Sequence, residues 1–187
     1  MASRYEINLA GSGGQGLVLA GVILAEAAIF EGKQATQTQS YGPESRGGAS
    51  KSEVILSDEE IDYPKCTDLD LLLLMTEAAA DKYLPTAQEK AVVIADADLV
   101  PNEFPSTVKK GVKAPITKLA REEVGRGFVA NIVALGLICE LTKIISINAL
   151  EKAVLKRVPK GTEELNRKAI EIGREAAHTY GKNLLKE

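Results

Sequence analysis

The chain has 187 residues, of which 45% are hydrophobic and 26% are charged, a composition typical of one globular domain. A net charge of −3 and an aromatic share of 4%, without Trp, give no electrostatic or stacking reason to bind nucleic acid or an anionic membrane. Two cysteines and one histidine are too few for this chain alone to hold a cysteine-ligated iron–sulfur cluster or a structural zinc ion.

The cysteines and the first apolar segment bear on where the protein resides. Cys66 and Cys139 are far apart and form no C-x-x-C motif, so we expect free thiols in the reducing cytoplasm. The segment Leu17–Phe30 contains Glu26 and is shorter than the ~18–20 apolar residues that cross a bilayer. No signal peptide is evident. We therefore predict a cytoplasmic protein without a membrane segment, with residues 1–187 forming a single domain.

The first predicted elements are a strand over Tyr5–Ala10, a glycine-rich loop and a helix over Leu17–Phe30, for which Gly32 is a suitable end. The first N–H groups of a helix are unpaired and carry partial positive charge, so the loop before it is a candidate anion site. The candidate residues are Gly11, Ser12, Gly13, Gly14, Gln15 and Gly16.

A second candidate site follows a short strand predicted over Lys33–Thr38. The segment Gln37–Lys51, QTQSYGPESRGGASK, has no aliphatic residue larger than alanine and is predicted to be a surface loop. A long loop that carries Tyr, Glu and Arg is more often functional than idle. Its candidate residues are Ser40, Tyr41, Gly42, Pro43, Glu44, Ser45, Arg46, Gly47 and Gly48.

The middle of the chain alternates strands and helices. Solid apolar runs such as DLLLLM and AVVIA are typical of strands buried on both faces. Thr76 is placed to cap a helix over Glu77–Leu84, and Asp96 and Asp98 follow a strand, where they either bind a metal or cap loops. The predicted strands are Glu53–Leu56, Asp70–Met75, Ala91–Ala95 and an edge strand over Val112–Ile116.

The last third of the chain is predicted to be helical. Thr117 is expected to cap a short helix through Val124, and Ser146 to begin a later one. Between them Phe128–Leu141 is a nearly all-apolar helix, in which the Asn131 amide needs partners and is expected to hold a neighbouring loop. The final helix is amphipathic, and we expect His178 within it to be solvated rather than catalytic.

This alternation predicts an α/β fold: a Rossmann-like three-layer sandwich with a mostly parallel sheet and C-terminal helices. Ligands of such folds bind beyond the carboxyl ends of the strands. The glycine loop, Thr76 and the two aspartates are therefore expected to share one edge of the sheet.

The spacing of Gly11, Gly13 and Gly16 fits the dinucleotide fingerprint G-x-G-x-x-G. Such a site needs an acidic residue about 20 positions later, but Gln34–Gln39 holds no carboxylate, and no Lys-Ser/Thr pair follows the glycines as in a Walker A motif. From these residues alone, two interpretations remain: a free-standing Rossmann-type nucleotide-binding enzyme, and a scaffold whose glycines serve only packing and assembly.

Two longer motifs are more specific. GSGGQGLVLAGVILAEAAIFEGK followed by QSYGPESRGGASKSEVILS resembles the γ subunit, or γ domain, of the 2-oxoacid:ferredoxin (acceptor) oxidoreductases. The resemblance continues through DLLLLMTEAAADKYL and GFVANIVALG, so it covers essentially the whole chain. Within the family, SYGPESRGG is most similar to the 2-oxoglutarate type.

The resemblance implies a subunit of a multisubunit enzyme that decarboxylates a 2-oxoacid oxidatively with coenzyme A, giving acyl-CoA, carbon dioxide and reduced ferredoxin. Thiamine diphosphate and iron–sulfur clusters are then expected on α, β and δ partner subunits, because this chain has only two cysteines and no GDG signature. We expect the isolated chain to hold none of these cofactors, to be inactive and to be able to homodimerise.

The resemblance also implies roles for the two loops. Gly11–Gly16 and Ser40–Gly48 are expected to face the catalytic subunits and to shape the approach of coenzyme A or the thiamine site. Arg46 offers a planar fork for a phosphate or carboxylate, and Gly47 and Gly48 permit close backbone approach. The alternative is that Glu44 and Arg46 only form ion pairs across a subunit interface.

Overall fold

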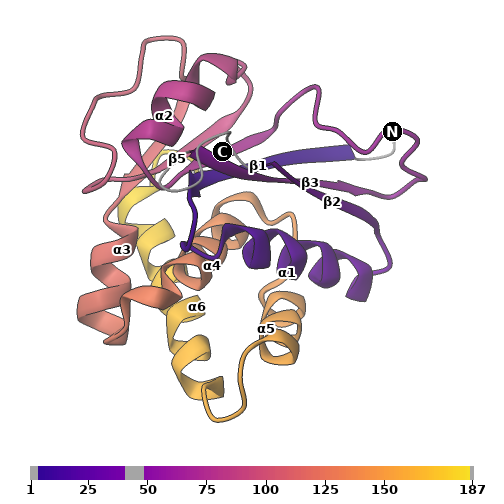
Figure 1. Ribbon diagram of the computed structural model, residues 1–187, viewed down its shortest axis with the longest axis vertical. Coiled ribbons are helices and arrows are strands. Elements are labelled where there is room, and N and C mark those ends of the chain that lie inside the picture. Colours follow the sequence, from indigo (N-terminus) through magenta and orange to yellow (C-terminus); the bar gives the residue numbers. More distant parts are fainter. Residues whose placement is uncertain (1–3, 41–48, 186–187) are drawn as a thin grey trace.

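The computed structural model describes residues 4–40 and 49–185 and has an α/β architecture built on one six-stranded sheet (Figure 1). The strand order is β2-β3-β1-β4-β5-β6. The strands are β1 (Arg4–Ser12), β2 (Gln34–Ser40), β3 (Ala49–Ser57), β4 (Leu71–Leu74), β5 (Val92–Asp96) and β6 (Lys110–Ala114).

The sheet is mixed. β1, β4, β5 and β6 pair in parallel, whereas β3 runs antiparallel to both β1 and β2. The four leucines of β4 lie at the centre and are all buried, as expected of a strand covered on both faces. The predicted α/β class is thus confirmed, with β3 as the one strand that points the opposite way.

Helices cover the two faces unequally (Figure 1). A short helix, α2 (Glu77–Tyr83), packs on one face with the segment that follows β5. The other face carries the larger helical layer. Its helices are α1 (Leu17–Phe30), α3 (Ile116–Leu119), α4 (Ala130–Thr142), α5 (Ile147–Arg157) and α6 (Glu163–Tyr180).

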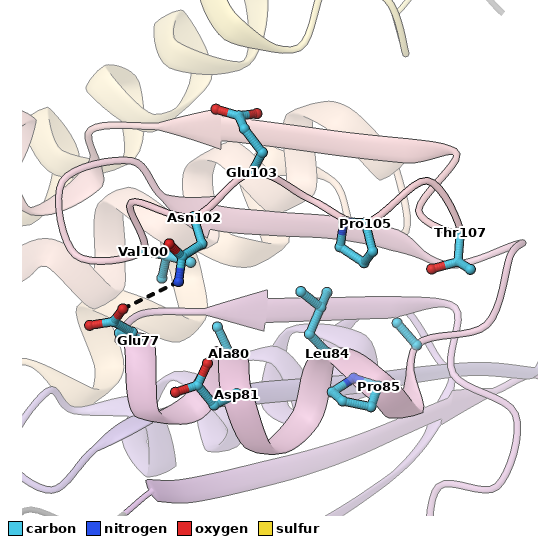
Figure 2. A pocket seen from close by; sticks show the side chains of 11 residues that line it. Glu77, Ala80, Asp81, Leu84, Pro85, Val100, Asn102, Glu103, Pro105 and Thr107 are labelled. Carbon is cyan, nitrogen blue, oxygen red and sulfur yellow. Dashed lines mark hydrogen bonds between the residues drawn. The ribbon is translucent and has the colours of Figure 1, made fainter.

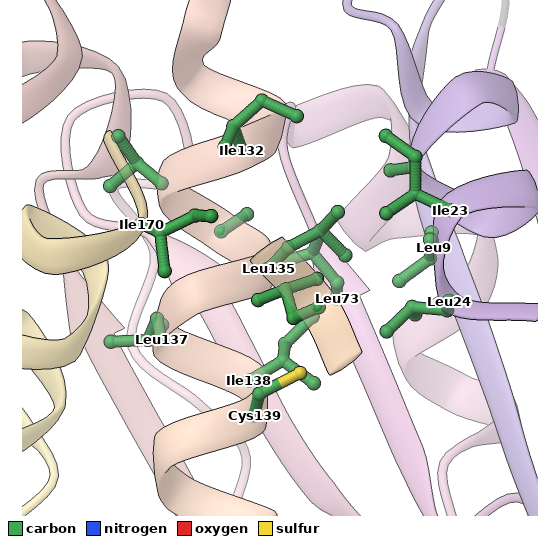
Figure 3. Close-up of a cluster of buried hydrophobic side chains, with 14 of the residues drawn as sticks. Leu9, Ile23, Leu24, Leu73, Ile132, Leu135, Leu137, Ile138, Cys139 and Ile170 are labelled. Atoms are coloured by element: carbon green, nitrogen blue, oxygen red, sulfur yellow. The ribbon is translucent and has the colours of Figure 1, made fainter. Parts of the chain in front are cut away.

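Helix α4 is the centre of the larger core. Figure 3 shows Leu135 and Ile138 of α4 facing Leu73 of β4, with Ile23 of α1 beyond them and Ile170 of α6 on the opposite side. An apolar helix without a polar face has to be enclosed in this way.

Glycines let α6 approach α4 closely. A Cβ atom at Gly173 would overlap the carbonyl oxygen of Val133, and one at Gly136 would overlap that of Ile170. The two helix backbones are therefore in direct contact.

The predicted Gln37–Lys51 loop is wrong at both ends, because β2 continues to Ser40 and β3 begins at Ala49. Both strands are rich in Thr, Ser and Gln at these ends, and β2 lies at the sheet edge, where a polar strand needs no apolar core face. The first strand also extends past its predicted end, so Gly11 and Ser12 belong to β1 rather than to a loop.

Two predicted helix caps are confirmed and one is wrong. The Thr76 and Ser146 hydroxyls accept hydrogen bonds from Ala79 N (3.3 Å) and Ala149 N (3.2 Å). Thr117 is instead inside a helix that begins at Ile116, after Pro115. Its backbone N–H donates to the Asp96 carboxylate at 2.7 Å, so the tertiary contact takes the place of the expected cap.

Other helix bounds differ by a turn. The segment Gly127–Val129 forms a 3-10 turn before α4, and Leu84–Thr86 forms another after α2. Within residues 4–40 and 49–185, we find no helix with the length and hydropathy needed to cross a bilayer.

Candidate functional site

The glycine loop connects β1 to α1 with a backbone that only glycine adopts readily. Gly14 and Gly16 have φ angles of 89° and 72°, in the left-handed region. Gly16 is the residue before α1 and has no side chain with which to cap it. The first turn of this helix therefore presents its N–H groups to whatever lies beyond the loop.

Two side chains hold the loop in place from the inside. The Gln15 carboxamide accepts a hydrogen bond from Ser12 N at 2.8 Å and donates one to the Met75 carbonyl at 3.1 Å. The buried Asn131 of α4 donates to the Gly16 carbonyl at 3.1 Å, so this residue holds a neighbouring loop as expected. Gln15 was a candidate ligand-binding residue, but its side chain is occupied in tying the loop to the end of β4.

A cleft of about 530 Å³ opens at the N-terminus of α1. Its lining combines loop glycines, the first turns of α1, the start of β3 and one residue from the end of α5. The lining residues are Ser12, Gly13, Gly14, Gly16, Leu17, Val18, Leu19, Val22, Ser50, Lys51 and Arg157.

Two cations line this cleft, and each is paired with a carboxylate. Lys51 lies 2.7 Å from Glu53, and Arg157 forms a two-pronged ion pair with Glu26, with both N–O distances at 2.6 Å. The hydrogen bonds from Arg157 lower the pKa of Glu26 below its ordinary value. The Lys51 ammonium also lies 5.8 Å from the centre of the Tyr83 ring in α2, so its charge is shared with the face of the sheet that α2 covers. Backbone N–H groups and two basic residues at the margin make the cleft suited to an anion such as a phosphate.

The second candidate loop joins the sheet beside the first. Ser12, at the end of β1, pairs with Ala49, and Ser40, at the end of β2, pairs with Lys51. The two motifs therefore meet at one edge of the sheet. Most of the second motif lies outside the described residues: Tyr41, Gly42, Pro43, Glu44, Ser45, Arg46, Gly47 and Gly48.

The strand order disfavours a dinucleotide at this loop. In a dinucleotide-binding fold the strand beside β1 is parallel to it and carries the ribose-binding carboxylate at its end. Here β1 lies between β4, which is parallel, and β3, which is antiparallel and begins at this edge with Ala49. The position that the ribose needs is thus occupied by the start of a strand without a carboxylate.

The other polar candidates have structural partners. Asp96 is fully buried and accepts hydrogen bonds from the backbone N–H groups of Asp98 (3.1 Å) and Thr117 (2.7 Å), so it caps loops. His178 is exposed at the surface, with Nε2 3.2 Å from Glu140. No group of three or more His, Cys, Asp or Glu side chains suited to a metal occurs among the described residues.

The two thiols are poor nucleophiles. Burial raises the pKa of both Cys66 and Cys139 to about 12. Thiolates are the form that reacts or binds metal, so neither cysteine is prepared for that chemistry.

A second cavity, of about 550 Å³, lies between α2 and the segment after β5 (Figure 2). Its floor is apolar, with Ala80, Leu84 and Val100, and Glu77 accepts a hydrogen bond from Asn102 across it at 3.3 Å. Carboxylates at its rim, from Glu77, Asp81 and Glu103, disfavour an anionic ligand there. The cleft at the glycine loop is therefore the better candidate site.

The sequence candidates did not include the two basic residues of that cleft. Lys51 follows the second motif directly, and a basic residue at the start of a strand was the available signal. Arg157 has no such signal, because it reaches the cleft only through the packing of α5 on α1.

Known proteins share both the sequence and the fold of this chain. The family described as pyruvate ferredoxin/flavodoxin oxidoreductase matches residues 6–176. The 2-oxoglutarate synthase subunit KorC of Methanocaldococcus jannaschii is 51% identical, covering 93% of this chain and 94% of the relative. KorC of Methanothermobacter marburgensis is 46% identical, and the match covers 92% of this chain and 96% of the relative.

A solved structure of high sequence identity has the same fold. The gamma subunit of a keto/oxoacid ferredoxin oxidoreductase from Geobacter sulfurreducens is 52% identical, with a TM-score of 0.84, and the match covers 94% of this chain and 99% of that one.

Proposed function

The chain belongs to the pyruvate ferredoxin/flavodoxin oxidoreductase family, and from this membership we infer that it is the gamma subunit of a 2-oxoglutarate:ferredoxin oxidoreductase. The observation that carries this inference is the 51% identity, over 93% of the chain, to a 2-oxoglutarate synthase subunit. The free-standing nucleotide-binding enzyme has no comparable support.

The complex oxidises 2-oxoglutarate in a balanced reaction. The bond between C1 and C2 breaks, carbon dioxide leaves, and the remaining acyl group forms a thioester with the coenzyme A sulfur. The two electrons released reduce ferredoxin, and the thiol proton of coenzyme A leaves to solvent. This chain supplies binding surface and backbone donors to that reaction and no reacting side chain of its own.

The described residues do not fit an iron–sulfur cluster. Cys66 is half-buried and Cys139 is buried, and both thiols have raised pKa values. We therefore propose that partner subunits hold the clusters and, as the family resemblance implies, the thiamine diphosphate.

The cleft at the glycine loop does fit a phosphate group. It lies where the N-terminus of α1, Lys51 and Arg157 meet. We propose that Gly13, Gly14 and Gly16 offer backbone N–H groups to coenzyme A or thiamine diphosphate bound between this chain and a partner. We further propose that Ser40–Gly48, with Arg46, contributes to binding the same group. Thiamine diphosphate, when bound, supplies the carbanion chemistry of decarboxylation.

We propose α, β and δ subunits as partners, with ferredoxin as the electron acceptor of the complex. One relative is a longer chain: the ketoisovalerate oxidoreductase subunit VorA of Methanothermobacter marburgensis is 31% identical over 74% of this chain, which corresponds to 28% of the relative. The same domain thus also occurs inside a longer polypeptide. Two free cysteines favour the cytoplasm as the compartment.

Reconstitution tests the proposed function. The chain is co-purified with its α, β and δ candidates, and coenzyme A-dependent reduction of ferredoxin is measured with 2-oxoglutarate, pyruvate and 2-oxoisovalerate. We expect the highest kcat/KM with 2-oxoglutarate and a loss of activity when this chain is omitted. Full activity without the chain would contradict the assignment as a required subunit, and a preference for pyruvate would contradict the substrate.

A further inference from the structure

Strand β2 is one edge of the sheet, and no other strand of residues 4–40 and 49–185 pairs with its outer side. Its sequence over Gln34–Ser40 contains no charged residue, proline or glycine. Natural edge strands usually carry such residues, because an unprotected row of N–H and C=O groups recruits other strands. The opposite edge, β6, is shorter and carries Lys110 and Lys113. The two edges of this sheet are thus protected very differently.

An apolar stripe on α1 flanks the open edge. Gly21 faces the sheet, because a Cβ atom there would lie 3.3 Å from the side chain of Gln37 in β2. The helix therefore runs beneath β2, as Figure 1 also shows. Val22, which also lines the cleft, Ala25 and Ile29 follow one another at helical spacing and are partly exposed, Ile29 to 57%.

The sequence of β2 is complementary to itself. In an antiparallel pair centred on Gln37, Thr36 of one strand lies opposite Thr38 of the other, and Ala35 lies opposite Gln39. Thr–Thr pairs across strands are favourable, and no like charges meet. A twofold axis through this centre would place both α1 helices on the same face of the joined sheet, antiparallel and with their apolar stripes adjacent.

We propose that β2 is a docking edge for a second copy of this chain. Two six-stranded sheets become continuous through an antiparallel β2–β2 pair, and Ala25 and Ile29 are buried between the two α1 helices. The occupant is a second copy rather than an unrelated strand, because neutrality and self-complementarity both occur in the same seven residues.

The mass of the purified full chain in solution tests the proposal. Sedimentation equilibrium is measured over roughly 5–200 µM, the concentration range in which weak protein dimers form. The expected mass approaches twice the 20.0 kDa of one chain. The double variant Thr36→Lys, Thr38→Lys places lysines opposite lysines, and it is expected to remain monomeric. Its matched control, Thr107→Lys with Thr179→Lys, adds the same charge at exposed positions outside β2 and is expected to dimerise as the wild type does.

A cross-link identifies the geometry. Gln37→Cys is expected to form a disulfide-linked dimer under mild oxidation, whereas Gln34→Cys is not, because Gln34 lies opposite Ser40 in the centred pair. A specific weak dimer has a dissociation constant of at most about 200 µM. A wild-type chain that stays monomeric up to that concentration would overturn the proposal. A Thr36→Lys, Thr38→Lys variant that is folded by circular dichroism and still dimeric would overturn it equally.

Discussion

Gly16 has two separate constraints, a left-handed backbone and a close neighbour. Its φ is 72°, and a Cβ atom there would lie 2.6 Å from the Asn131 side-chain nitrogen. Gly14 shares only the first constraint, since its φ is 89° and a Cβ atom at this position would have no neighbour within 4 Å among the described residues. Gly13 has neither constraint. Substitutions at Gly16, Gly14 and Gly13 therefore form a series in which the number of constraints falls from two to one to none.

Alanine substitutions along this series should differ in their effect on stability. Gly16→Ala should lower the free energy of unfolding by about 2–4 kcal/mol, because strain and overlap add, and Gly14→Ala should lower it by about 1 kcal/mol. Gly13→Ala is the matched control and should stay within about 0.5 kcal/mol of wild type. Urea denaturation measures all three. Equal losses at the three positions would show that the loop geometry is not as described.

Lys51 tests the cleft itself. Lys51→Gln should raise the KM for coenzyme A of the reconstituted complex about 3–10-fold, with kcat nearly unchanged, because one charged contact to a phosphate is lost. Lys33→Gln is the control: Lys33 also forms a surface ion pair, 3.7 Å from Asp58, but at the opposite end of β2 and outside the cleft. A KM that is unchanged in Lys51→Gln, or raised as much in Lys33→Gln, would contradict a role in binding.

At the scale of elements, the α4–α6 contact depends on backbone proximity. Gly173→Ala should lower the free energy of unfolding by about 3 kcal/mol, because the new methyl group overlaps the Val133 carbonyl and only a shift of α6 can relieve it. Gly127→Ala, at a position with open space and ordinary φ, is the control and should be nearly neutral. Thermal unfolding of both variants measures the difference, and similar melting temperatures would exclude the close contact.

Glu140 joins the same two helices electrostatically. It is buried on α4, pairs with Lys143, and lies 3.2 Å from Arg174 of α6. Burial opposes its charge, but the hydrogen bonds from Lys143 and Arg174 prevail, and the pKa of Glu140 lies below its ordinary value. A carboxylate with a lowered pKa stabilises the fold above its unfolded pKa, and this stabilisation is lost as the pH falls through the folded pKa.

The expected result is a pH-dependent difference between variants. At pH 7, Glu140→Gln should cost about 1–2 kcal/mol, and the difference from wild type should shrink as the pH falls below the ordinary pKa of a glutamate and through the lower folded pKa, where the wild-type carboxyl becomes protonated. The control is Glu164→Gln, because the Glu164 side chain is 87% exposed. Its free energy of unfolding should stay within about 0.5 kcal/mol of wild type at neutral and at acidic pH. A difference that is independent of pH would assign the effect to packing rather than to charge.

Local signals predicted local features well. Thr76 and Ser146 cap helices as expected, because a cap depends on three or four consecutive residues. Thr117 failed as a cap because Asp96, 21 residues away along the chain, takes its N–H. The ends of β2 and β3 and the reversed direction of β3 were missed, because strand pairing depends on distant partners rather than on the polar residues of Gln37–Lys51.

The candidate site, too, was predictable only where its residues are neighbours in the sequence. The pattern makes Gly11–Gly16 and Ser40 candidates, and their meeting at one edge follows from the strand order that only the structure supplies. Arg157 reaches the cleft from the end of α5, more than 100 positions after the motifs, and no pattern near those motifs indicates it.

At the scale of the whole molecule, the chain has two cysteines, too few for a cysteine-ligated iron–sulfur cluster, and both thiols have raised pKa values. We predict that the purified chain is colourless, binds no iron after anaerobic reconstitution with iron and sulfide, and does not reduce ferredoxin with 2-oxoglutarate and coenzyme A. Activity should appear only when partner subunits are added. The visible spectrum and the ferredoxin assay test this directly, and a brown chain that is active alone would refute the subunit assignment.

The reversed strand β3 has an evolutionary consequence. β2 and β3 pair without a break, from Gln34 opposite Ser57 to Ser40 opposite Lys51. The connection between the two strands is therefore anchored at both ends by a continuous ladder. Changes of length or composition between Ser40 and Ala49 are therefore expected to leave the register of the sheet unchanged. The glycine loop, held by β1 and α4, is expected to keep its place as well.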